Sequence, residues 1–529
     1  MITRLRTWSL TLVLPFAGGA LLEGCAIVTN AGDYSTKECA TNQDCPGDNR
    51  ICRKSDGQCV SLVTAECTTV LGDYKDDDAV ILGATVALTG SNASVGIPEK
   101  NAIALALQDF RTSGNGLPPV PGSTKRRPLS VVVCDDAATT EVAKRSAEHL
   151  VKTLEVPAII GPTWSGVAVT LLTTITVPAG TLMIGTGTTS PDLTSLQKDG
   201  LFFRTITSMT GETRAMSSLV SDIETRVRAN LNGTTEDIKV ALLHKGDSYG
   251  KGSAQVMLNT LTFNGKPALD VASQANFTQA NYGDSGNPTA SPLKYPETVA
   301  EVLAKKPHII IAIGTGEVFA NLVGPIEQQW DISLPYRPYW IFPHNQFTKA
   351  TTDFLVANDP PGRNLRQRFV GATPGTEDPN YQQFKLNYPT VATPDGPDPN
   401  SFGASNTYDS VYVAAFAAVG LGSEKITGHS LAGAIAKLKS GPKINVGVND
   451  LNQGLTLLSQ GQSIDLEGVS GPLDFDLATG DVNQLIQVWC IPLGDDAHPA
   501  SPRTSGYHFG LDGNGAVGSF DLVTTTCKW

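Results

Sequence analysis

From residue 79 onwards, apolar runs of strand length alternate with amphipathic segments of helix length. Apolar residues recur at helical spacing in 98–112, where Ile103, Leu107 and Phe110 share one face. Strands that alternate with helices are typical of βαβ units and parallel sheets, so we predict an α/β protein. The apolar runs lie at 80–88, 129–134, 158–160, 181–184, 238–244, 308–313, 338–342 and 369–373.

The remaining pattern predicts further helices and a terminal hairpin. Segments 471–476 and 483–491 read as that hairpin, 279–296 as a surface excursion, and the chain after 495 as a polar tail. Helical spacing of apolar residues occurs at 141–154, 253–261, 298–305, 317–329, 408–421 and 431–439.

Two predicted strands end in loops of glycine and hydroxyl residues that lead into helix-like sequence. The run at 158–160 continues as GPTWSGV, and the run at 181–184 continues as GTGTTSP. A loop that enters a helix presents unpaired backbone N–H groups and the positive end of the helix dipole. Two such junctions side by side predict a site for a carboxylate or another anion.

The first 25 residues have the pattern of an export signal. Two arginines precede a short apolar stretch, Trp8–Leu22, which is followed by Glu-Gly-Cys. Residues 22–25 resemble a bacterial lipobox, in which Cys25 is lipidated, although Glu23 replaces the usual small residue. We therefore expect an exported protein, periplasmic or at the cell surface, that meets the membrane only through a lipid anchor. Ordinary export with a free Cys25 is the alternative.

The nine cysteines agree with an oxidising compartment. Four of them fall in a polar segment too short to bury a core, so we predict that disulfide bonds hold it together. A zinc site is the alternative, but the CxxC pairs of structural zinc are missing and no histidine is near. These four are Cys39, Cys45, Cys52 and Cys59; two more bridges are expected among Cys67, Cys134, Cys490 and Cys527, with every pairing open.

Charge and length narrow the function further. The 39 basic and 51 acidic residues give a net charge of −12, which argues against nucleic acid as a partner. A chain of 529 residues is too long for one core, so we expect at least two lobes. No metal or cofactor site is predicted, because the histidines form no cluster.

A series of motifs resembles one known family when read in order. Residues 79–495 are similar to type I periplasmic solute-binding proteins of the leucine/isoleucine/valine-binding group, which serve ABC importers. The resemblance implies two doubly wound parallel-sheet lobes, joined by a three-strand hinge, that close over a small polar solute. The motifs are LGATVALTGSNASVG, VVVCDDAATTEVAKRSAEHLV, AIIGPTWSGV, LMIGTGTTSPDLT, FFRTITS, KVALLHKGDSYGKG, HIIIAIGTGEV and SGPLDFDLATGDV.

The resemblance also implies domain bounds and partners. The ligand would be an amino acid or a related small carboxylate or amide, and the partners an ABC permease and ATPase. The expected divisions are a signal peptide (1–25), a Cys-rich tether (26–78), lobe 1 (79–206 and 371–465), lobe 2 (207–370 and 466–495) and a C-terminal tail (496–529).

The family pattern assigns the anion-binding half of the site to the first lobe. Ser165, with Trp164 beside it, and the hydroxyls of Thr188 and Thr189 would hold the ligand's carboxylate, while the Gly187 carbonyl would be open to an ammonium. Hydroxyls and N–H groups at helix starts can bind a carboxylate without a formal charge. Simple helix capping is the alternative for Ser165 and Thr189.

The part of the site that the second lobe would supply matches the family pattern less well. Tyr249 of GDSYG corresponds to an aromatic that covers the ligand, and Thr315 lies in the loop after HIIIAI. Val95 stands where a pocket-lining aromatic is common, with loop packing as the alternative. His344 could contact an anionic or hydroxylated ligand, with an ordinary polar loop position as the alternative.

Amino-acid binders of this group offer carboxylates to the ligand's ammonium, and this chain lacks them at the usual positions. Ser208-Met209 and Pro343-His344-Asn345 stand there instead. Burying an uncompensated ammonium costs several kcal/mol. A standard α-amino acid therefore fits poorly unless Glu212, Asp247 or Glu317 turns inward.

Two rival functions remain open. Gly246–Gly250 satisfies the G-x-S-x-G pattern of a serine hydrolase elbow, with Ser248 as the nucleophile, but nothing in the sequence nominates its histidine. We therefore predict no catalytic residue and no enzyme. A ligand-sensing receptor domain of the same fold, coupled to a signalling partner, is the stronger rival.

Overall fold

The computed structural model describes residues 38–196, 198–359, 364–375, 379–392, 399–493, 499–509 and 516–517. The predicted signal peptide, the predicted lipidation site Cys25 and the predicted disulfide cysteine Cys527 lie outside the described residues.

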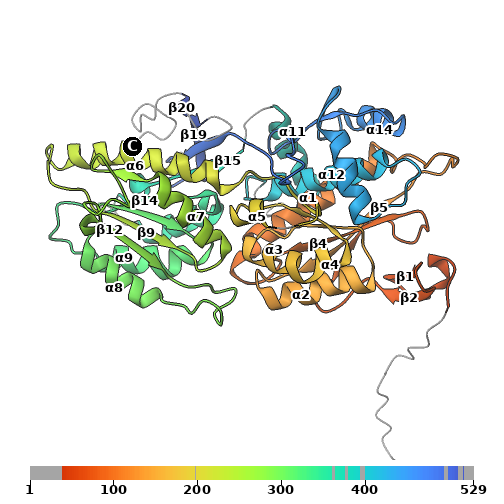
Figure 1. The fold of residues 1–529 in the computed structure, drawn as a ribbon, viewed down its shortest axis with the longest axis horizontal. Coiled ribbons are helices and arrows are strands. Elements are labelled where there is room, and N and C mark those ends of the chain that lie inside the picture. Colours follow the sequence, from red (N-terminus) through yellow and green to blue (C-terminus); the bar gives the residue numbers. More distant parts are fainter. Residues whose placement is uncertain are drawn as a thin grey trace, which may run out of the picture. The chain divides into compact units, whose positions relative to one another are not determined.

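A six-stranded sheet organises the first lobe (Figure 1). Its neighbouring strands are parallel except at one edge, where β3 runs antiparallel to β5. The predicted parallel sheet is therefore a mixed one. The order is β3 (Thr69–Leu71), β5 (Leu129–Asp135), β4 (Val80–Val86), β6 (Ala158–Ile160), β7 (Leu182–Gly185) and β8 (Phe202–Arg204).

Helices cover both faces of this sheet because successive strand residues point to opposite sides. On one face, α1 (Ala93–Thr112) packs against the much later α12 (Ala404–Gly420), and both lie on Val131 and Val133 of β5 (Figure 1). On the other face, α2 and α3 pack on Val132 and Cys134. The other helices of this lobe are α2 (Thr140–Glu148), α3 (Ser165–Leu171), α4 (Val177–Ala179), α5 (Asp192–Ser195), α11 (Pro379–Asn387), α13 (Gly428–Ala434) and α14 (Leu451–Ser459).

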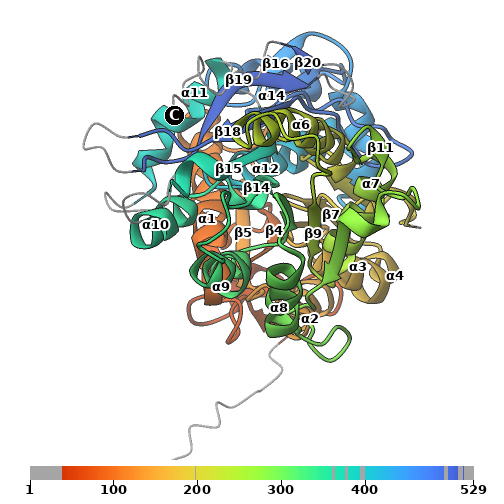
Figure 2. The ribbon, with the colours of Figure 1, turned by 90° about the vertical axis from the view of Figure 1, so that its left-hand side faces the viewer.

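A larger sheet organises the second lobe (Figure 2). Strands β12, β9, β13, β14 and β15 are parallel, and β18, β19 and β20 continue the sheet antiparallel, so this sheet is also mixed. The order is β12 (Phe277–Asn281), β9 (Val240–His244), β13 (Ile309–Ile313), β14 (Tyr339–Phe342), β15 (Phe369–Pro374), β18 (Ile486–Cys490), β19 (Arg503–Phe509) and β20 (Ala516–Val517).

Two layers of helices enclose this second sheet. The long α6 (Met209–Asn230) and α7 (Ser248–Thr260) share one apolar core with the sheet. Helix α8 (Tyr295–Lys305) and the turn that precedes α9 (Gly324–Gln329) share the core of the opposite face. A further helix, α10 (Lys349–Asn358), follows β14.

The chain passes between the two sheets after β8, after β15 and before β18, where the resemblance implies a hinge. The last passage comes later than predicted. Leu473, Phe475 and Val482 pack in the first-lobe core, so lobe 2 does not resume at 466. The chain enters the core of the second lobe again only at Ile486, the first residue of β18, which pairs with Pro374 of β15.

Three other expectations need correction. The predicted hairpin of 471–476 with 483–491 is wrong, because β18 pairs with β15 and β19 instead. Strand β19 lies in the stretch predicted as a polar tail, and its alternate residues Ser505, Tyr507 and Phe509 are buried. The excursion at 279–296 begins inside edge strand β12, whose alternate residues are exposed.

A small disulfide-bonded module precedes the first lobe. Strands β1 (Arg50–Arg53) and β2 (Gln58–Ser61) form a hairpin held by the bridges Cys39–Cys52 and Cys45–Cys59, which confirms the disulfide prediction over the zinc site. The bridge Cys67–Cys134 then fastens the chain to β5, and Cys490 is also a disulfide cysteine. The tether prediction of 26–78 is thus wrong at its end, because β3 belongs to the first sheet.

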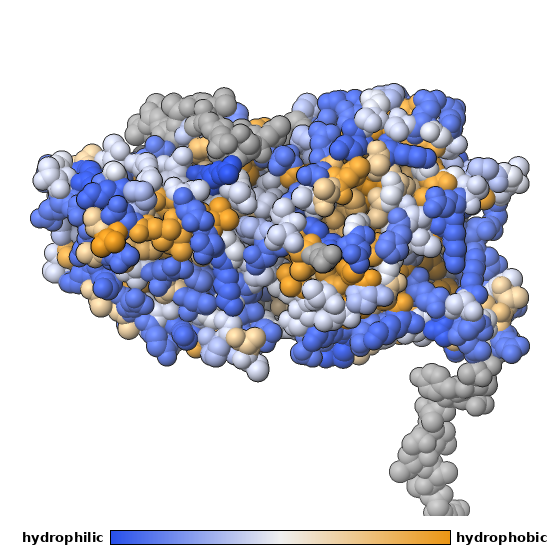
Figure 3. All heavy atoms as spheres, in the orientation of Figure 1, coloured by the Kyte–Doolittle hydropathy of each residue, from blue (hydrophilic) through white to orange (hydrophobic). Residues whose placement is uncertain are grey.

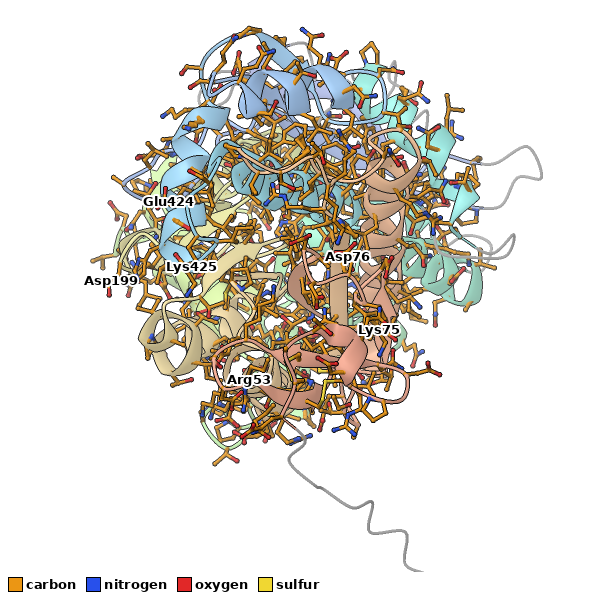
Figure 4. The ribbon with its side chains drawn as sticks, turned by 90° about the vertical axis from the view of Figure 1, so that its right-hand side faces the viewer. Arg53, Lys75, Asp76, Asp199, Glu424 and Lys425 are labelled. Atoms are coloured by element: carbon orange, nitrogen blue, oxygen red, sulfur yellow. A yellow bond between two sulfur atoms is a disulfide. The ribbon has the colours of Figure 1, made fainter. Side chains whose placement is uncertain are left out.

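Polar contacts hold the module on the first lobe (Figure 4). The Arg53 guanidinium donates to the carbonyl of Thr153 at 3.1 Å. The Lys75 ammonium binds the carbonyls of Cys45 and Gly47 at 3.3 and 3.0 Å. The module is therefore anchored to the lobe by side chains as well as by the chain itself.

Hydrophilic residues cover most of the face in Figure 3, and apolar residues form separate patches over both lobes. Within the described residues, no helix combines the length and apolar character needed to span a bilayer.

Candidate functional site

Loops at the C-terminal ends of strands from both lobes meet at one place. The first lobe contributes the loops after β6 and β7, and the second contributes the start of α7 and the turn His344–Gln346 after β14. Ser190 Oγ donates to the Ser248 carbonyl at 2.9 Å, and the His344 ring stacks on Phe402 with centroids 4.3 Å apart. The two lobes therefore touch around these loops.

Glycines make the first-lobe loops possible. Gly161 has φ +95°, and a Cβ there would lie 2.2 Å from the Thr85 carbonyl oxygen. A Cβ on Gly187 would lie 2.5 Å from Thr163 Cγ2 and 2.7 Å from the Phe402 ring. Since no larger side chain fits at either position, the two loops can approach each other only with glycine.

The two predicted junctions are in direct contact. Ser165 Oγ accepts a hydrogen bond from the backbone N–H of Ser190 at 3.1 Å. Neither Ser165 nor Thr189 occupies a helix N-cap, which removes the capping alternative: Trp164 and Pro191 stand there. The Gly187 carbonyl accepts the N–H of Thr189 at 3.0 Å and so already has one partner.

Buried polar atoms without a hydrogen-bond partner gather at this junction. An unsatisfied buried polar group costs about 1–3 kcal/mol, so such atoms are rare unless a ligand or water completes them. Thr188 Oγ1 turns back towards Gly185, and the others lie on the loops that meet. Among the described residues these atoms are Trp164 Nε1, Thr188 Oγ1, Thr189 Oγ1, Ser248 Oγ, Tyr249 Oη, His344 Nε2, Asn345 Oδ1 and Gln346 Oε1.

His344 is a fully buried residue of the site rather than an ordinary loop histidine. Its backbone N–H donates to Glu212 Oε1 at 2.7 Å, and its Nδ1 hydrogen-bonds to Glu212 Oε2 at 2.6 Å. Its ring lies between Phe402 and the edge of Tyr249, whose centroid is 5.8 Å away. Because Nδ1 is occupied, only Nε2 is left for another partner.

Glu212, Asp247 and Glu317, which an amino-acid ligand would need near its ammonium, have buried side chains. Burial raises the pKa of Tyr249 well above its usual value, and the nearby charges of Glu212, Asp247 and Glu317 raise it further. Glu317 accepts from Tyr282 Oη at 2.9 Å and from both the N–H and the hydroxyl of Thr315. The second-lobe wall of the site is therefore acidic.

Lys245 is the basic residue within this acidic wall. Its Nζ lies 3.2 Å from Asp247 and 3.4 Å from Asp284. Burial lowers the pKa of Lys245, but the charges of Asp247, Glu317 and Asp284 outweigh burial and hold it above its usual value. One ammonium thus faces several carboxylates, which leaves a negative potential beside Tyr249.

Glu99 connects the two first-lobe loops from behind and was missed by the sequence analysis. Its carboxyl accepts from Thr163 Oγ1 at 2.5 Å, from Thr186 Oγ1 at 2.9 Å and from Thr407 Oγ1 at 3.3 Å. Burial raises the pKa of Glu99 to about 8. Its signal in the sequence was a lone acid on the buried face of an amphipathic helix.

Asn345, Gln346 and Phe402 were also missed. The amide nitrogen of Asn345 donates to the Gly314 carbonyl at 3.2 Å, and that of Gln346 to the Thr315 carbonyl at 3.1 Å. The amide oxygens of both residues have no hydrogen-bond partner among the described residues, and the Asn345 side chain lies beside the Tyr249 hydroxyl. Val95, which was predicted, is buried in the same apolar cluster as Trp164 and Phe402.

A hollow of about 200 Å³ lies along the seam between the lobes, lined by Trp164 and Gly166 on one side and by Asp247 and Ser248 on the other. Ser248 opens α7, and no described histidine is hydrogen-bonded to its hydroxyl. The arrangement a hydrolase nucleophile needs is therefore not formed around this serine in the described part of the chain.

Comparisons with known proteins identify the family and the fold. The model of the receptor family ligand binding region matches residues 98–489. Among curated proteins, none matches the sequence.

Solved structures share the fold at low sequence identity. A leucine-binding protein from Thermotoga maritima has a TM-score of 0.56 at 14% identity, covering 80% of this chain and 98% of its own. A solute-binding protein of an ABC transporter from Rhodopseudomonas palustris, in complex with 3,4-dihydroxybenzoic acid, gives 0.55 at 18%, covering 82% and 98%. A branched-chain amino-acid transporter substrate-binding protein from Streptococcus pneumoniae, in complex with isoleucine, gives 0.53 at 17%, covering 80% and 99%.

Proposed function

The chain belongs to the family of receptor ligand-binding regions, and we propose that it is an extracytoplasmic solute-binding protein of an ABC importer. In this proposal it captures an amino acid, or a related small carboxylate or amide, by closing its two lobes over the ligand. The permease and ATPase of that importer are the expected partners.

The observation that carries this proposal is the set of unpartnered buried polar atoms at the meeting of the lobes. On the first lobe, the Trp164 N–H and the Thr189 hydroxyl can donate to a carboxylate without a formal charge. On the second lobe, Asn345 Oδ1, Gln346 Oε1 and the Tyr249 hydroxyl can accept from a donor group. The two halves together match a small ligand with an acceptor end and a donor end.

The buried carboxylates on the second lobe make the site suitable for the ammonium of an amino acid as well. An ammonium on Asn345 Oδ1 and Gln346 Oε1 would lie beside the buried carboxylates of Glu212 and Glu317. Those carboxylates offset the cost of burying the ammonium, although each is already hydrogen-bonded within the protein. Amino acids and benzoic acids also appear in the complexes of the similar structures.

Closure of the lobes supplies the mechanism. A ligand bound by groups of both lobes stabilises the arrangement in which the lobes touch, and it shifts the open–closed equilibrium by its differential affinity for that state. The Ser190–Ser248 hydrogen bond and the His344–Phe402 stack are contacts that such a closed state would gain.

Export and anchoring belong to the same proposal. The bridges Cys39–Cys52, Cys45–Cys59 and Cys67–Cys134 suit an oxidising compartment. We propose lipidation at Cys25 as the tether to the outer face of a membrane, which mass spectrometry of the mature N-terminus tests directly.

A ligand-sensing receptor domain is the second candidate, favoured by the description of the matched family. Both functions use the same ligand site and differ in the partner of the closed form. Solute uptake into proteoliposomes that contain the permease and ATPase encoded beside the gene of this chain would support transport. Ligand-dependent binding to a kinase or chemotaxis receptor, without uptake, would support sensing.

A thermal-shift screen with titration calorimetry tests the ligand site. Leucine, isoleucine, benzoate, 3,4-dihydroxybenzoate and simple amides are suitable probes, and a ligand at 100 times its dissociation constant adds about 2.7 kcal/mol to the unfolding free energy. Tyr249→Phe should weaken binding of any hit, because it removes one unpartnered hydroxyl. Tyr336→Phe is the matched control, since the Tyr336 hydroxyl donates to the backbone carbonyl of Lys306, away from the site. Equal binding by both variants would contradict the proposed site.

A further inference from the structure

A second hollow, of about 600 Å³, opens on the first lobe; we call it the outer hollow. It is lined by the end of β3, the start of β5 and one side of α1, with Leu71, Leu107 and Leu129 among its residues. Strand β5 starts at this hollow, and the loop after β5 reaches the seam between the lobes at Ala138. A strand of that length spans about 20 Å, so the outer hollow is separate from the candidate site.

The floor of the outer hollow is apolar. Phe110 and Leu107 of α1 and Leu129 of β5 line it and are themselves almost fully buried. The turn at Gly72, with φ +90°, forms one wall, and a Cβ there would lie 2.4 Å from the Leu129 carbonyl oxygen. Glycine thus lets the wall approach the strand closely beside the apolar floor.

The rim of the outer hollow is basic. Arg111, Arg126 and Arg127 line it against the single acid Asp73, although the whole chain carries a net charge of −12. The Arg126 guanidinium is used by the fold, because it donates to the carbonyls of Gly114, Asn115 and Gly116. The side chain of Arg111 is exposed.

Arg127 is the residue that the fold leaves incomplete. It is only 8% exposed, and its Nε donates to the Pro118 carbonyl at 3.0 Å. Its two terminal nitrogens have no hydrogen-bond partner among the described residues, and burial lowers its pKa. Arg127 also borders a smaller hollow beside the disulfide module. The two terminal nitrogens are not among the fully buried polar atoms, so solvent reaches them and they are free to bind an anion, while the charge of Asp78 opposes the effect of burial on the pKa of Arg127.

We propose that the outer hollow is a second ligand site, for an organic anion with an apolar body. The anionic group would take the open donors of Arg127, whose planar fork suits a carboxylate or sulfonate, with Arg111 adding charge at the rim. The apolar body would cover Phe110, Leu107 and Leu129. A volume of about 600 Å³ lies within the range of small-molecule sites.

Fluorescence titration of the full chain with 1-anilinonaphthalene-8-sulfonate tests this proposal. Its uncharged relative N-phenyl-1-naphthylamine has the same apolar body without the anion. The sulfonate should bind at least about tenfold more tightly than the amine, salt should weaken it, and decanoate should displace it. No binding of the sulfonate, or equal binding of the two dyes, would overturn the proposal.

Variants locate the bound dye. Arg127→Gln should weaken sulfonate binding about tenfold or more. Arg111→Glu, at an exposed position, should also weaken it and covers the case in which the Arg127 variant fails to fold. Lys425→Glu is the charge-matched control, at an exposed residue of the same lobe (Figure 4), and should bind as the wild type does. Loss of dye binding in Tyr249→Phe, with none in Arg111→Glu, would place the dye in the seam and refute the outer site.

Discussion

Ionisation of Glu99 should weaken the first lobe as the pH rises. The carboxyl is fully buried between Thr163 and Thr186 of the two ligand loops, and burial raises its pKa from 4.5 to about 8. Between those values the folded state keeps a proton that the unfolded state has released. The stabilising contribution is therefore complete below pH 4.5 and is lost progressively up to about pH 8.

The magnitude follows from the two pKa values. Each pH unit in this window removes about 1.4 kcal/mol of unfolding free energy, or about 5 kcal/mol over the whole window, as an upper estimate. Asp136 titrates in part of the same window, because burial raises its pKa to about 7. Its contribution must therefore be separated from that of Glu99.

Glu99→Gln achieves this separation. Glutamine has nearly the same shape and stays uncharged, so Thr163 and Thr186 keep a partner while the titration disappears. Urea unfolding of both proteins at pH 5, 6, 7 and 8 should show the wild type losing up to about 1.4 kcal/mol more per pH unit than the variant. Asp136 titrates in both proteins, and in the wild type its charge also helps to raise the pKa of Glu99. Parallel stability curves for the two proteins would refute the reasoning.

Three further results are expected. Ser165→Ala combined with Thr189→Ala should abolish the ligand-induced thermal shift and should lower the unfolding free energy of the unliganded protein by about 1–3 kcal/mol, because the buried Ser190 N–H loses its partner; a retained shift would place the ligand elsewhere. Replacing both Cys67 and Cys134 by alanine should cost about 4 kcal/mol in urea unfolding, because their bridge closes a loop with a sequence separation of 67. Arg204→Met should cost about 3–5 kcal/mol, since it leaves Asp481 without its buried partner, whereas Lys152→Met at an exposed ion pair should cost under about 1 kcal/mol.

The repeating part of the fold could be predicted because its signal is local. Strands β4 to β7, β9 and β13 to β15 appear as apolar runs, and the helices between them show helical spacing. Strands β12 and β19 were not recognised, because their buried residues alternate with more exposed ones and neither forms a continuous apolar run. The pairing of β18 with β15 depends on contacts between segments far apart in the sequence, which no local pattern reveals.

Part of the candidate site could be proposed from the sequence for the same reason. The glycine and hydroxyl loops are contiguous motifs, so the sequence indicates Ser165 and Thr189 as candidates, and Tyr249 lies in a third such motif. Glu99 and Phe402 reach the site from α1 and from the segment before α12, which are far apart in the sequence, and Asn345 and Gln346 depend on anchors at the carbonyls of another loop. Their roles are set by tertiary contacts alone.

A crystal structure of the full chain with a ligand confirmed by calorimetry tests the central claim most directly. The account predicts the ligand between the lobes, accepting from the Thr189 hydroxyl or the Trp164 N–H and donating to Asn345 Oδ1 or Gln346 Oε1. A ligand found outside this junction, with the same polar atoms satisfied by water or left unpaired, would contradict it.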